Sequence, residues 1–241
     1  MRVEINDLET RRFGFSFGRL DAVAARHGLG ESLAAADADG IEVVSTRVDT
    51  TDLGLVRAVE DHGFRIMDTL VYHRRTLPLA ERGDAAGQVS DLTEADARRG
   101  ATLARRAFRR YLGHYHADPR LSDDAADDAY ADWTARLLTD PPPGQIALGT
   151  RNGDGLTGFL IGQPRADGTS EIVLNAVDPD AQRGGIYTAL LRTYLQRAGA
   201  RGDREVVIST QLQNYPVQRA WSRAGFVLYR SFHTLHRWAR V

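Results

Sequence analysis

The chain has 241 residues, of which 42% are hydrophobic, and it carries a formal net charge of −1 with no cysteine. This balanced charge gives no basic field to attract a polyanion, so the composition argues against a nucleic-acid-binding protein. Without cysteine there are no disulfides, thiolate metal ligands or cysteine nucleophiles, and because all 31 basic residues are arginine, no lysine can form a Schiff base.

The first predicted unit is residues 1–80, a smaller α/β domain followed by a polar, glycine- and alanine-rich linker at 78–88. Within this unit, residues 55–75 align without gaps with residues 217–237, and both segments carry Arg-Ala, Gly-Phe and a final arginine at equal spacing. One interpretation is that helices ending at glycine look alike, because glycine supplies the left-handed cap. The other is that residues 1–80 are a degenerate half-copy of the C-terminal fold.

The second predicted unit, residues 87–241, has the succession of strands and helices that is typical of an α/β protein with a mixed sheet. We expect strands at 87–92, 144–151, 155–164, 170–177, 205–211, 226–231 and 232–238, with a hairpin turn at 152–155. Helices are expected from Thr93 to about Tyr111 and over 123–138, 185–199 and 214–224. No apolar run reaches the roughly 18 residues of a membrane span, so we expect a cytoplasmic protein with no membrane partner.

The junction at 175–187, with the sequence NAVDPDAQRGGIY, joins a strand to a helix through two glycines. The free backbone N–H groups at the start of a helix bind phosphate well. Taken alone, the two glycines are explained equally well by a tight strand-to-helix turn. The Gly-x-Gly-x-x-Gly dinucleotide pattern and the Walker phosphate-binding pattern are both absent from the sequence.

This junction resembles the acyl-CoA loop of the GNAT N-acetyltransferases, V-x-P-x-x-[RQ]-x-x-G-x-[GA], which stands here as Val177, Pro179, Gln182, Gly185 and Tyr187. The order of elements over 87–241, an asparagine at Asn214 and the Ala-Gly-Phe at 224–226 extend the resemblance. It implies a GNAT acyltransferase fold with a mixed, splayed central sheet, preceded here by a smaller α/β half-GNAT-like N-terminal domain. It also implies acetyl-CoA as co-substrate.

The resemblance implies which residues bind the cofactor. Backbone N–H groups of the loop would hold the pyrophosphate, and the end of strand 170–177 would bind the pantetheine arm and polarise the thioester carbonyl. An alternative role for Asn214 is to cap the helix that follows it. The implied cofactor-binding residues are Ala176, Val177, Gln182, Arg183, Gly184, Gly185, Ile186, Tyr187 and Asn214.

Four segments, 8–21, 59–75, 106–133 and 209–226, together resemble a narrower group, the dTDP-fucosamine (dTDP-4-amino-4,6-dideoxygalactose) acetyltransferases. This resemblance implies acetyl transfer to the amino group of a nucleotide-linked amino sugar, by direct attack in a ternary complex. Three alternatives stay open: another small amine, another acyl-CoA, or an acyl-CoA-binding protein without catalysis. A homodimer is possible, and no nucleic-acid partner is expected.

The proton transfers are less well defined by the sequence. In the family a tyrosine seven residues after the asparagine protonates the departing thiolate, but here that position is Trp221. Tyr215 and Tyr187 are the nearby phenols, and Tyr187 would serve if it faced the cleft. For the base we expect His116 or Glu171, although a surface histidine and an exposed strand-end glutamate are the simpler interpretations.

The acceptor would be held by His114, Tyr115 and Asn175, since the loop between the first two helices lines the acceptor site in this family. His114 and His116 do not share a helix face, and no third ligand lies nearby in the sequence, so no metal site is expected. Tyr130 and Trp133 have the spacing of a buried helix face that could line the acceptor pocket with one edge.

Overall fold

The computed structural model describes residues 2–77, 89–109, 111, 113–182 and 184–239. Its strands are β1 (Glu4–Ile5), β2 (Phe17–Leu20), β3 (Val43–Asp49), β4 (Arg65–Thr76), β5 (Val89–Asp91), β6 (Ile146–Asn152), β7 (Gly155–Pro164), β8 (Ser170–Val177), β9 (Glu205–Gln211) and β10 (Val227–Trp238). Its α-helices are α1 (Asp7–Phe13), α2 (Leu29–Ala38), α3 (Leu53–Asp61), α4 (Ala97–Ala107), α5 (Asp123–Thr139), α6 (Ile186–Arg201) and α7 (Tyr215–Arg223). Two short 3-10 helices, Glu94–Asp96 and Pro179–Ala181, precede α4 and α6.

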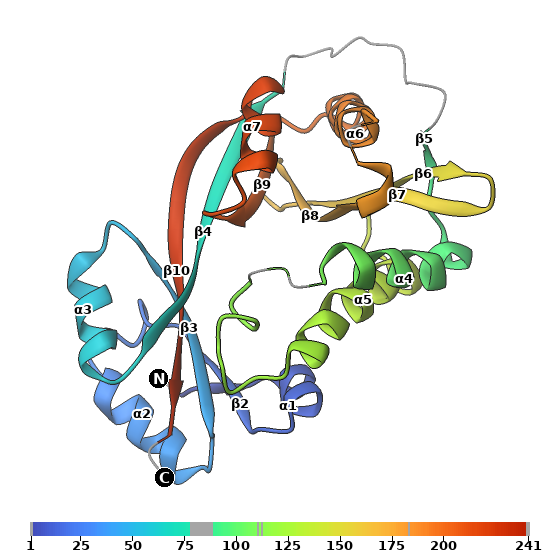
Figure 1. Cartoon of the computed structure of the whole chain (residues 1–241). Coiled ribbons are helices and arrows are strands. Elements are labelled where there is room, and N and C mark those ends of the chain that lie inside the picture. Colours follow the sequence, from blue (N-terminus) through green and yellow to red (C-terminus); the bar gives the residue numbers. More distant parts are fainter. Residues whose placement is uncertain (1, 78–88, 110, 112, 183, 240–241) are drawn as a thin grey trace.

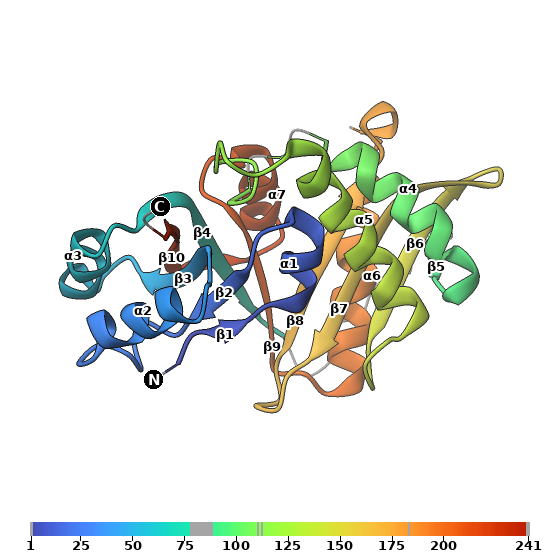
Figure 2. The ribbon, with the colours of Figure 1, turned by 90° about the horizontal axis from the view of Figure 1, so that it is seen from below.

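The described strands form one mixed sheet in the order β1-β2-β3-β10-β4-β9-β8-β7-β6-β5. Helices α4 and α5 cover one face of its second half, where they pack on Phe159, Ile161 and Leu174, while α6 and α7 lie on the other face (Figure 1). The predicted fold class is therefore confirmed. Helix α1 lies beside α5, and Arg12 pairs with Asp132 across them at 3.3 Å (Figure 2).

The sheet repeats one motif in mirror order about its centre. The run β2-α2-β3-α3-β4 has the same succession as β8-α6-β9-α7-β10, and the pairs β2/β3 and β8/β9 are both parallel. Strand β10 lies between β3 and β4, whereas β4 lies between β10 and β9. Each run therefore places its last strand beside the middle strand of the other.

This exchange also joins the hydrophobic cores. Leu235 on β10 packs in the core formed by α2, α3 and β3, and Leu77, just after β4, packs with α6, α7 and β9. The division into units 1–80 and 87–241 remains a prediction, and most of the expected linker lies outside the described residues. The two units share one continuous sheet.

One sequence prediction was wrong. The expected strands 226–231 and 232–238 are a single strand, β10. The segment 227–238 contains no glycine, proline, asparagine or aspartate, so it has none of these common turn-forming residues. Strand β10 runs on without a turn, and its pairing with β4 shifts register at Leu228/Arg230 and Thr234/Leu235.

Candidate active site

Strands β8 and β9 separate after a short paired stretch. They pair in parallel only over Ser170–Ile172 and Val206–Ile208. Beyond Ile172, β8 continues to pair with β7 on its other side, up to Val177 opposite Gly158. The edge of β8 at 173–177 thus faces a gap without a β9 partner, and the predicted splay is confirmed.

The loop after β8 has an ordered start and an open end. Asp178 accepts a hydrogen bond from the backbone N–H of Asp180, and Arg106 pairs with Asp178 at 3.0 Å and with Asp180 at 2.8 Å. Gly185 adopts φ = 76° as the N-cap of α6, and no side chain caps the helix. The first N–H groups of α6 are therefore free to bind an anion.

The other loop residues surround this helix end. Gln182 and Gly184 are exposed, and Ile186 and Tyr187 are half-buried on the first turn of α6. Arg183, also expected to bind the cofactor, lies outside the described residues. Ala176 and Val177, at the end of β8, adjoin the gap.

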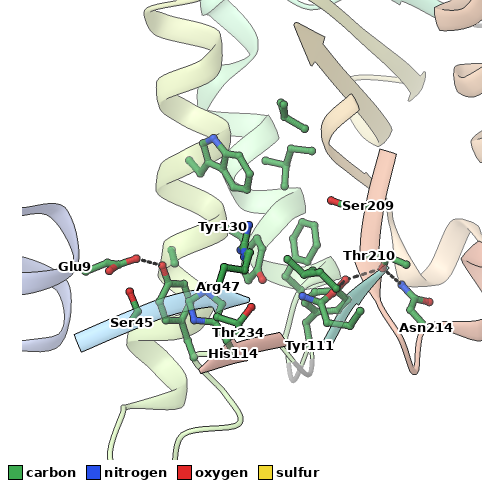
Figure 3. Close-up of a pocket in the computed structure, with 18 of the residues that line it drawn as sticks. Glu9, Ser45, Arg47, Tyr111, His114, Tyr130, Ser209, Thr210, Asn214 and Thr234 are labelled. Carbon is green, nitrogen blue, oxygen red and sulfur yellow. Dashed lines mark hydrogen bonds between the residues drawn. The ribbon is translucent and has the colours of Figure 1, made fainter. Parts of the chain in front are cut away.

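A pocket of about 500 Å³ extends from the gap between β8 and β9 towards the N-terminal half of the chain. One side of it comes from the sheet and the other from α1, the end of α4, the loop after α4, and α5 (Figure 3). Its volume is in the range of small-molecule sites. Glu171, Val173 and Asn175 all line it, as the alternation of side chains along a strand predicts.

Hydrogen bonds organise the end of the pocket nearest the gap. The side-chain amide of Asn214 donates to Thr210 Oγ1 at 3.0 Å, and the hydroxyl of Tyr111 lies 3.0 Å from the same oxygen. Tyr111 also donates to Gln211. Asn214 makes no side-chain cap to α7, so the capping role considered for it is not found. Its amide oxygen remains available to a ligand.

The middle of the pocket is aromatic. Phe108 and Tyr130 stack with ring centroids 4.2 Å apart, and Tyr111 meets Tyr130 edge-on at 5.7 Å. Tyr130 and Trp133 both line the pocket, so the buried face of α5 also serves the site. Burial raises the pKa of Tyr111, which keeps its phenol protonated at neutral pH.

The far end of the pocket is cationic. Arg19 on β2 and Arg47 on β3 line it and are exposed, and neither has a carboxylate partner among the described residues. The Arg47 side chain donates a hydrogen bond to the Tyr72 hydroxyl at 3.5 Å. Most other described arginines with printed contacts pair with aspartate or glutamate, for example Arg151 with Asp96 at 2.8 Å. An anionic ligand would supply the missing partner.

The two histidines of the loop after α4 lie in different places, one in the pocket and one outside it. His114 and Tyr115 line the pocket, as predicted. His116 does not line it: its side chain is 4% exposed and its Nε2 lies 3.0 Å from Asp127. The structure thus does not bring His116, an expected base, to the site. Tyr115 instead donates to Glu9 on α1, which fixes the loop against the N-terminal half.

Of the other expected catalytic side chains, only some line the pocket. Glu171 lines the pocket at the start of the gap, and one of its carboxylate oxygens accepts from Arg165 at 2.5 Å. Tyr215 is 60% exposed and is not among the pocket residues. Tyr187 is likewise not among the pocket residues. Its hydroxyl accepts a hydrogen bond at 2.5 Å from the indole N–H of Trp221, which is 1% exposed and does line the pocket.

Sequence reasoning missed Arg19, Arg47, Tyr111 and Thr210. An arginine on a strand is ordinarily a solvated surface residue, and nothing local in the sequence marks the two that face the pocket. The signal that was available is the narrower family resemblance of the N-terminal segment, which includes Arg19.

The N-terminal half has a counterpart of the glycine loop. Asp21 follows β2 as Asp178 follows β8, and Gly28 precedes α2 at the same spacing of seven residues as Gly185. In this copy, Asp52 stands where the gap-free alignment places Asn214. Its position is the N-cap of α3, and it accepts from the N–H of Leu55 at 3.1 Å.

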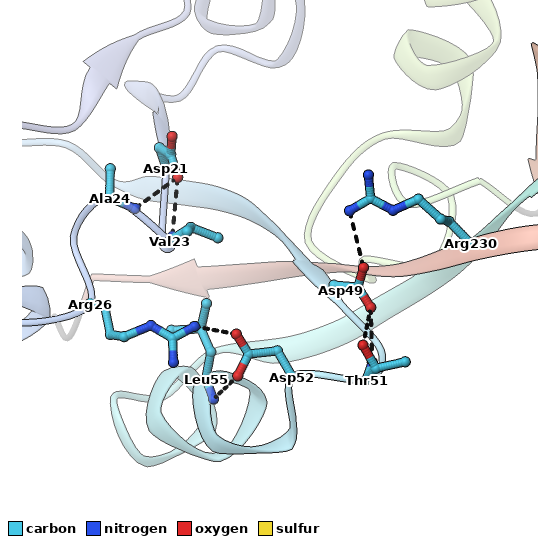
Figure 4. Close-up of polar contacts among 9 residues, drawn as sticks. All are labelled: Asp21, Val23, Ala24, Arg26, Asp49, Thr51, Asp52, Leu55 and Arg230. Carbon is cyan, nitrogen blue, oxygen red and sulfur yellow. Dashed lines mark hydrogen bonds and ion pairs between the residues drawn. The ribbon is translucent and has the colours of Figure 1, made fainter.

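Acidic side chains occupy this second loop (Figure 4). Asp21 accepts from the backbone N–H groups of Val23 and Ala24 at 3.1 Å each, and Asp52 pairs with Arg26. The Asp21 contacts have a counterpart in Asp178, which also accepts from a loop N–H group, so the two copies differ at Asp52. Its carboxylate takes up Arg26 and would repel a phosphate. Among the described residues, no group of three or more metal-ligating side chains is placed to hold an ion. No described helix has the length and apolar character needed to cross a membrane.

Comparison with known proteins gives a family. The sequence model of the acetyltransferase (GNAT) family matches residues 103–226. The spore coat polysaccharide biosynthesis protein SpsD of Bacillus subtilis (strain 168) is 32% identical over 138 residues, which are 56% of this chain and 45% of SpsD. The mycothiol acetyltransferase of Actinosynnema mirum is 31% identical over 84 residues, 35% of this chain and 28% of that protein. The match thus spans less than half the length of either relative.

Among solved structures, a GCN5-related N-acetyltransferase from Sphaerobacter thermophilus superimposes with a TM-score of 0.61. The match covers 90% of this chain and 70% of that one at 19% identity, and therefore concerns the fold.

Proposed function

The chain belongs to the acetyltransferase (GNAT) family, and from this premise we propose that it transfers an acetyl group from acetyl-CoA to the amino group of a nucleotide-linked amino sugar. The observation that carries the proposal is one continuous pocket. It joins the gap between β8 and β9 to Arg19 and Arg47 of the N-terminal half. The name of SpsD, a polysaccharide biosynthesis protein, is consistent with a sugar acceptor.

The length of the pocket favours an extended acceptor. Arg47 lies opposite Thr234, Thr234 opposite Asp68, and Ser209 opposite Tyr72. With about 4.8 Å between strands and about 3.3 Å per residue along them, Arg47 and Ser209 are roughly 19 Å apart at the backbone. An extended acceptor suits this backbone separation better than a compact amine does. A sugar with its amine at the gap and a diphosphate towards Arg19 and Arg47 would span the pocket.

The glycine loop and the free edge of β8 suit the co-substrate. The uncapped N–H groups of α6 would bind the pyrophosphate, and Gly185 leaves the approach free of a side chain. The unpaired edge of β8 at 173–177 would hydrogen-bond the pantetheine arm and polarise the thioester carbonyl, with Asn214 binding alongside.

The chemistry then needs a proton acceptor and a proton donor. We assign the acceptor to Glu171, the predicted base that lines the pocket, acting on the amine through water. The amine nitrogen forms the new C–N bond, and the C–S bond breaks. The departing sulfur takes a proton from the hydroxyl of Tyr187, which lies against the pocket residue Trp221 and regains its proton from solvent. Burial raises the pKa of Tyr187 and keeps it protonated, while the Trp221 N–H stabilises the phenolate as it forms.

A thiol-release assay tests the proposal. Acetyl-CoA would be combined with dTDP- and UDP-linked amino sugars, the same amino sugars without nucleotide, and simple amines. We expect turnover to be fastest with a nucleotide-linked sugar. Faster turnover of an amine without a nucleotide would instead support the alternative of another small acceptor. Calorimetry without acceptor completes the test: acetyl-CoA binding with no turnover on any amine would indicate a non-catalytic protein, and no binding would refute the proposal.

Cytoplasmic location and a homodimer remain predictions from the sequence.

A further inference from the structure

A chain of three hydrogen-bonded side chains, two of them buried, ends at the cationic part of the pocket. Asp118 Oδ2 lies 2.9 Å from His236 Nδ1, and His236 Nε2 lies 3.0 Å from His114 Nδ1. Asp118 is 2% exposed and His236 1% exposed, whereas His114 lines the pocket. The remaining ring nitrogen of His114, Nε2, has no partner among the described residues. We call these three residues the histidine chain.

The hydrogen bonds of Asp118 fix the direction of the chain. Its carboxylate accepts from the indole N–H of Trp238 at 2.9 Å and from the backbone N–H of Arg120 at 3.1 Å, in addition to His236. Burial opposes its ionisation, but these donors outweigh burial and hold the pKa of Asp118 below its usual value. An ionised carboxylate only accepts, so His236 Nδ1 must carry a proton.

The proton positions follow along the chain. In a neutral imidazole one nitrogen donates and the other accepts, so His236 with a protonated Nδ1 accepts at Nε2. His114 Nδ1 then donates to it, and His114 Nε2 is left with its lone pair. Burial, together with the nearby charges of Arg47 and Arg19, lowers the pKa of His114 well below its ordinary value, which disfavours a second proton.

The rings have little freedom to turn. His236 meets Phe17 edge-on at 5.7 Å, and His114 packs on Tyr115 at 3.9 Å between ring centroids. The bare nitrogen therefore keeps one direction relative to the two arginines.

We propose that Asp118 and His236 are positioning residues that lock His114 in the tautomer with a bare Nε2, which accepts a hydrogen bond from a hydroxyl or N–H group of the acceptor beside its anionic part. The site supplies a hydrogen-bond acceptor, His114 Nε2, near the two cationic donors Arg19 and Arg47. This arrangement selects a ligand that presents a hydrogen-bond donor next to a phosphate. The identity of the ligand rests on the proposed function; the tautomer does not.

The tautomer is measured directly by NMR of the ¹⁵N-labelled wild-type protein. We expect the His114 Nδ1 to carry the proton and Nε2 to show the shift of an unprotonated ring nitrogen. The competing arrangement has a doubly protonated His236 that donates to His114 Nδ1. A proton found on His114 Nε2 would overturn the proposal without any variant being made.

Binding of UDP, followed by calorimetry, tests the contact with ligand. His236→Phe keeps an aromatic ring but removes the acceptor for His114, so UDP affinity should fall at least fivefold, with acetyl-CoA affinity unchanged. His114→Phe, which alters only a pocket residue, should do the same. The matched control is His233→Phe on the same strand, whose ring contacts Thr69 and lies outside the pocket; it should bind UDP as wild type does.

The outcomes separate the two proposals. Wild-type affinity for UDP in both His236→Phe and His114→Phe would refute the role of the histidine chain. If the wild-type protein does not bind UDP but acetylates a simple amine, the nucleotide-linked acceptor is wrong. The effect of His236→Phe is then measured on KM for that amine, and an unchanged KM would again refute the histidine chain.

Discussion

Gly185 combines a positive φ with open space around the position of a Cβ atom. No heavy atom lies within 4 Å of that position, so a side chain there would project from the N-terminus of α6 into solvent or ligand. An aspartate at this end favours the helix through its dipole but repels a phosphate. The residue thus affects ligand binding more than folding.

We therefore expect Gly185→Asp to reduce acetyl-CoA affinity at least tenfold in calorimetry. The matched control is Gly153→Asp in the turn between β6 and β7, where φ is also positive, at 55°, and no atom lies within 4 Å. The control should bind like wild type. Equal affinity in Gly185→Asp and wild type would show that the loop does not hold the pyrophosphate.

Arg19 and Arg47 should act on the acceptor alone. A hydrogen bond to a charged group contributes about 1.5–3 kcal/mol, which corresponds to a change of about ten- to hundredfold in affinity. Arg19→Gln or Arg47→Gln should raise KM for a nucleotide-linked acceptor by about this factor and leave acetyl-CoA affinity unchanged. Arg57→Gln, on the exposed face of α3, is the control. An unchanged KM in both pocket variants would contradict an anionic acceptor.

Tyr187 and Tyr215 make opposite predictions about the proton donor. General acid catalysis contributes roughly 10²- to 10⁴-fold, so Tyr187→Phe should lower kcat at least tenfold without weakening acetyl-CoA binding. Tyr229→Phe, on β10 beside Arg74, controls for the loss of a phenol elsewhere. Full activity in Tyr187→Phe, together with a loss in Tyr215→Phe, would return the role to the exposed residue on α7.

At this scale the sequence predicts residues that are close in the chain and fails for those that are not. Asn214 and Asn175 line the pocket and Gly185 precedes α6, while their roles stay predictions. His116 was expected in the site because it neighbours His114, yet the loop after α4 forms a turn at 114–117 and the His116 ring contacts Asp127. Arg19 and Arg47 reach the pocket only through long-range pairing of strands.

Among the elements, β8 behaves as two strands in one. Its first three residues are paired on both sides, and the rest are paired only with β7. Unpaired edges bind extended ligands through main-chain hydrogen bonds, as in strand addition to a sheet. The function of this strand thus depends on where its second pairing stops.

Hydrogen exchange should detect this difference. Amides of 173–177 that face the gap should exchange faster than those of 170–172 without ligand, and acetyl-CoA should protect them. The strand β3, far from the gap, provides the comparison and should show no change with acetyl-CoA. Equal protection along β8 before and after acetyl-CoA would argue against pantetheine in the gap.

Most element types followed from the sequence because hydrophobic periodicity and turn residues are local. The bounds of β8 and β9 are those predicted, and α6 ends within two residues of expectation. The place where β8 and β9 part has no such signal. On its other side β9 is paired along its whole length with β4, whose partner residues come 129 to 141 residues earlier in the chain.

For the whole molecule, the mirrored strand order was only partly foreseeable. The alignment of 55–75 with 217–237 indicates equivalent helix-strand units, and α3-β4 and α7-β10 are those units. The alignment does not reveal that β4 and β10 each lie beside the other unit's middle strand, because strand neighbours are set by tertiary packing.

Although the fold repeats, we expect one acetyl-CoA per chain. The N-terminal copy has Asp52 in place of Asn214, and this carboxylate pairs with Arg26 of the N-terminal loop and would repel a phosphate. Calorimetry should give a stoichiometry of one, and Gly185→Asp should weaken that one site at least tenfold. A stoichiometry of two in the wild-type protein would show that the N-terminal loop is open.

The exchange of β4 and β10 makes the chain the covalent equivalent of a strand-swapped dimer. Two identical subunits that traded their last strands about a twofold axis would produce the same strand order, with assembly dependent on concentration. In a symmetric dimer every substitution appears in both copies, so both sites must keep the same residues. Fusion removes that constraint: one copy retains an open glycine loop, while the other is closed by Asp52 and Arg26 and contributes Arg19 and Arg47 to its neighbour's pocket.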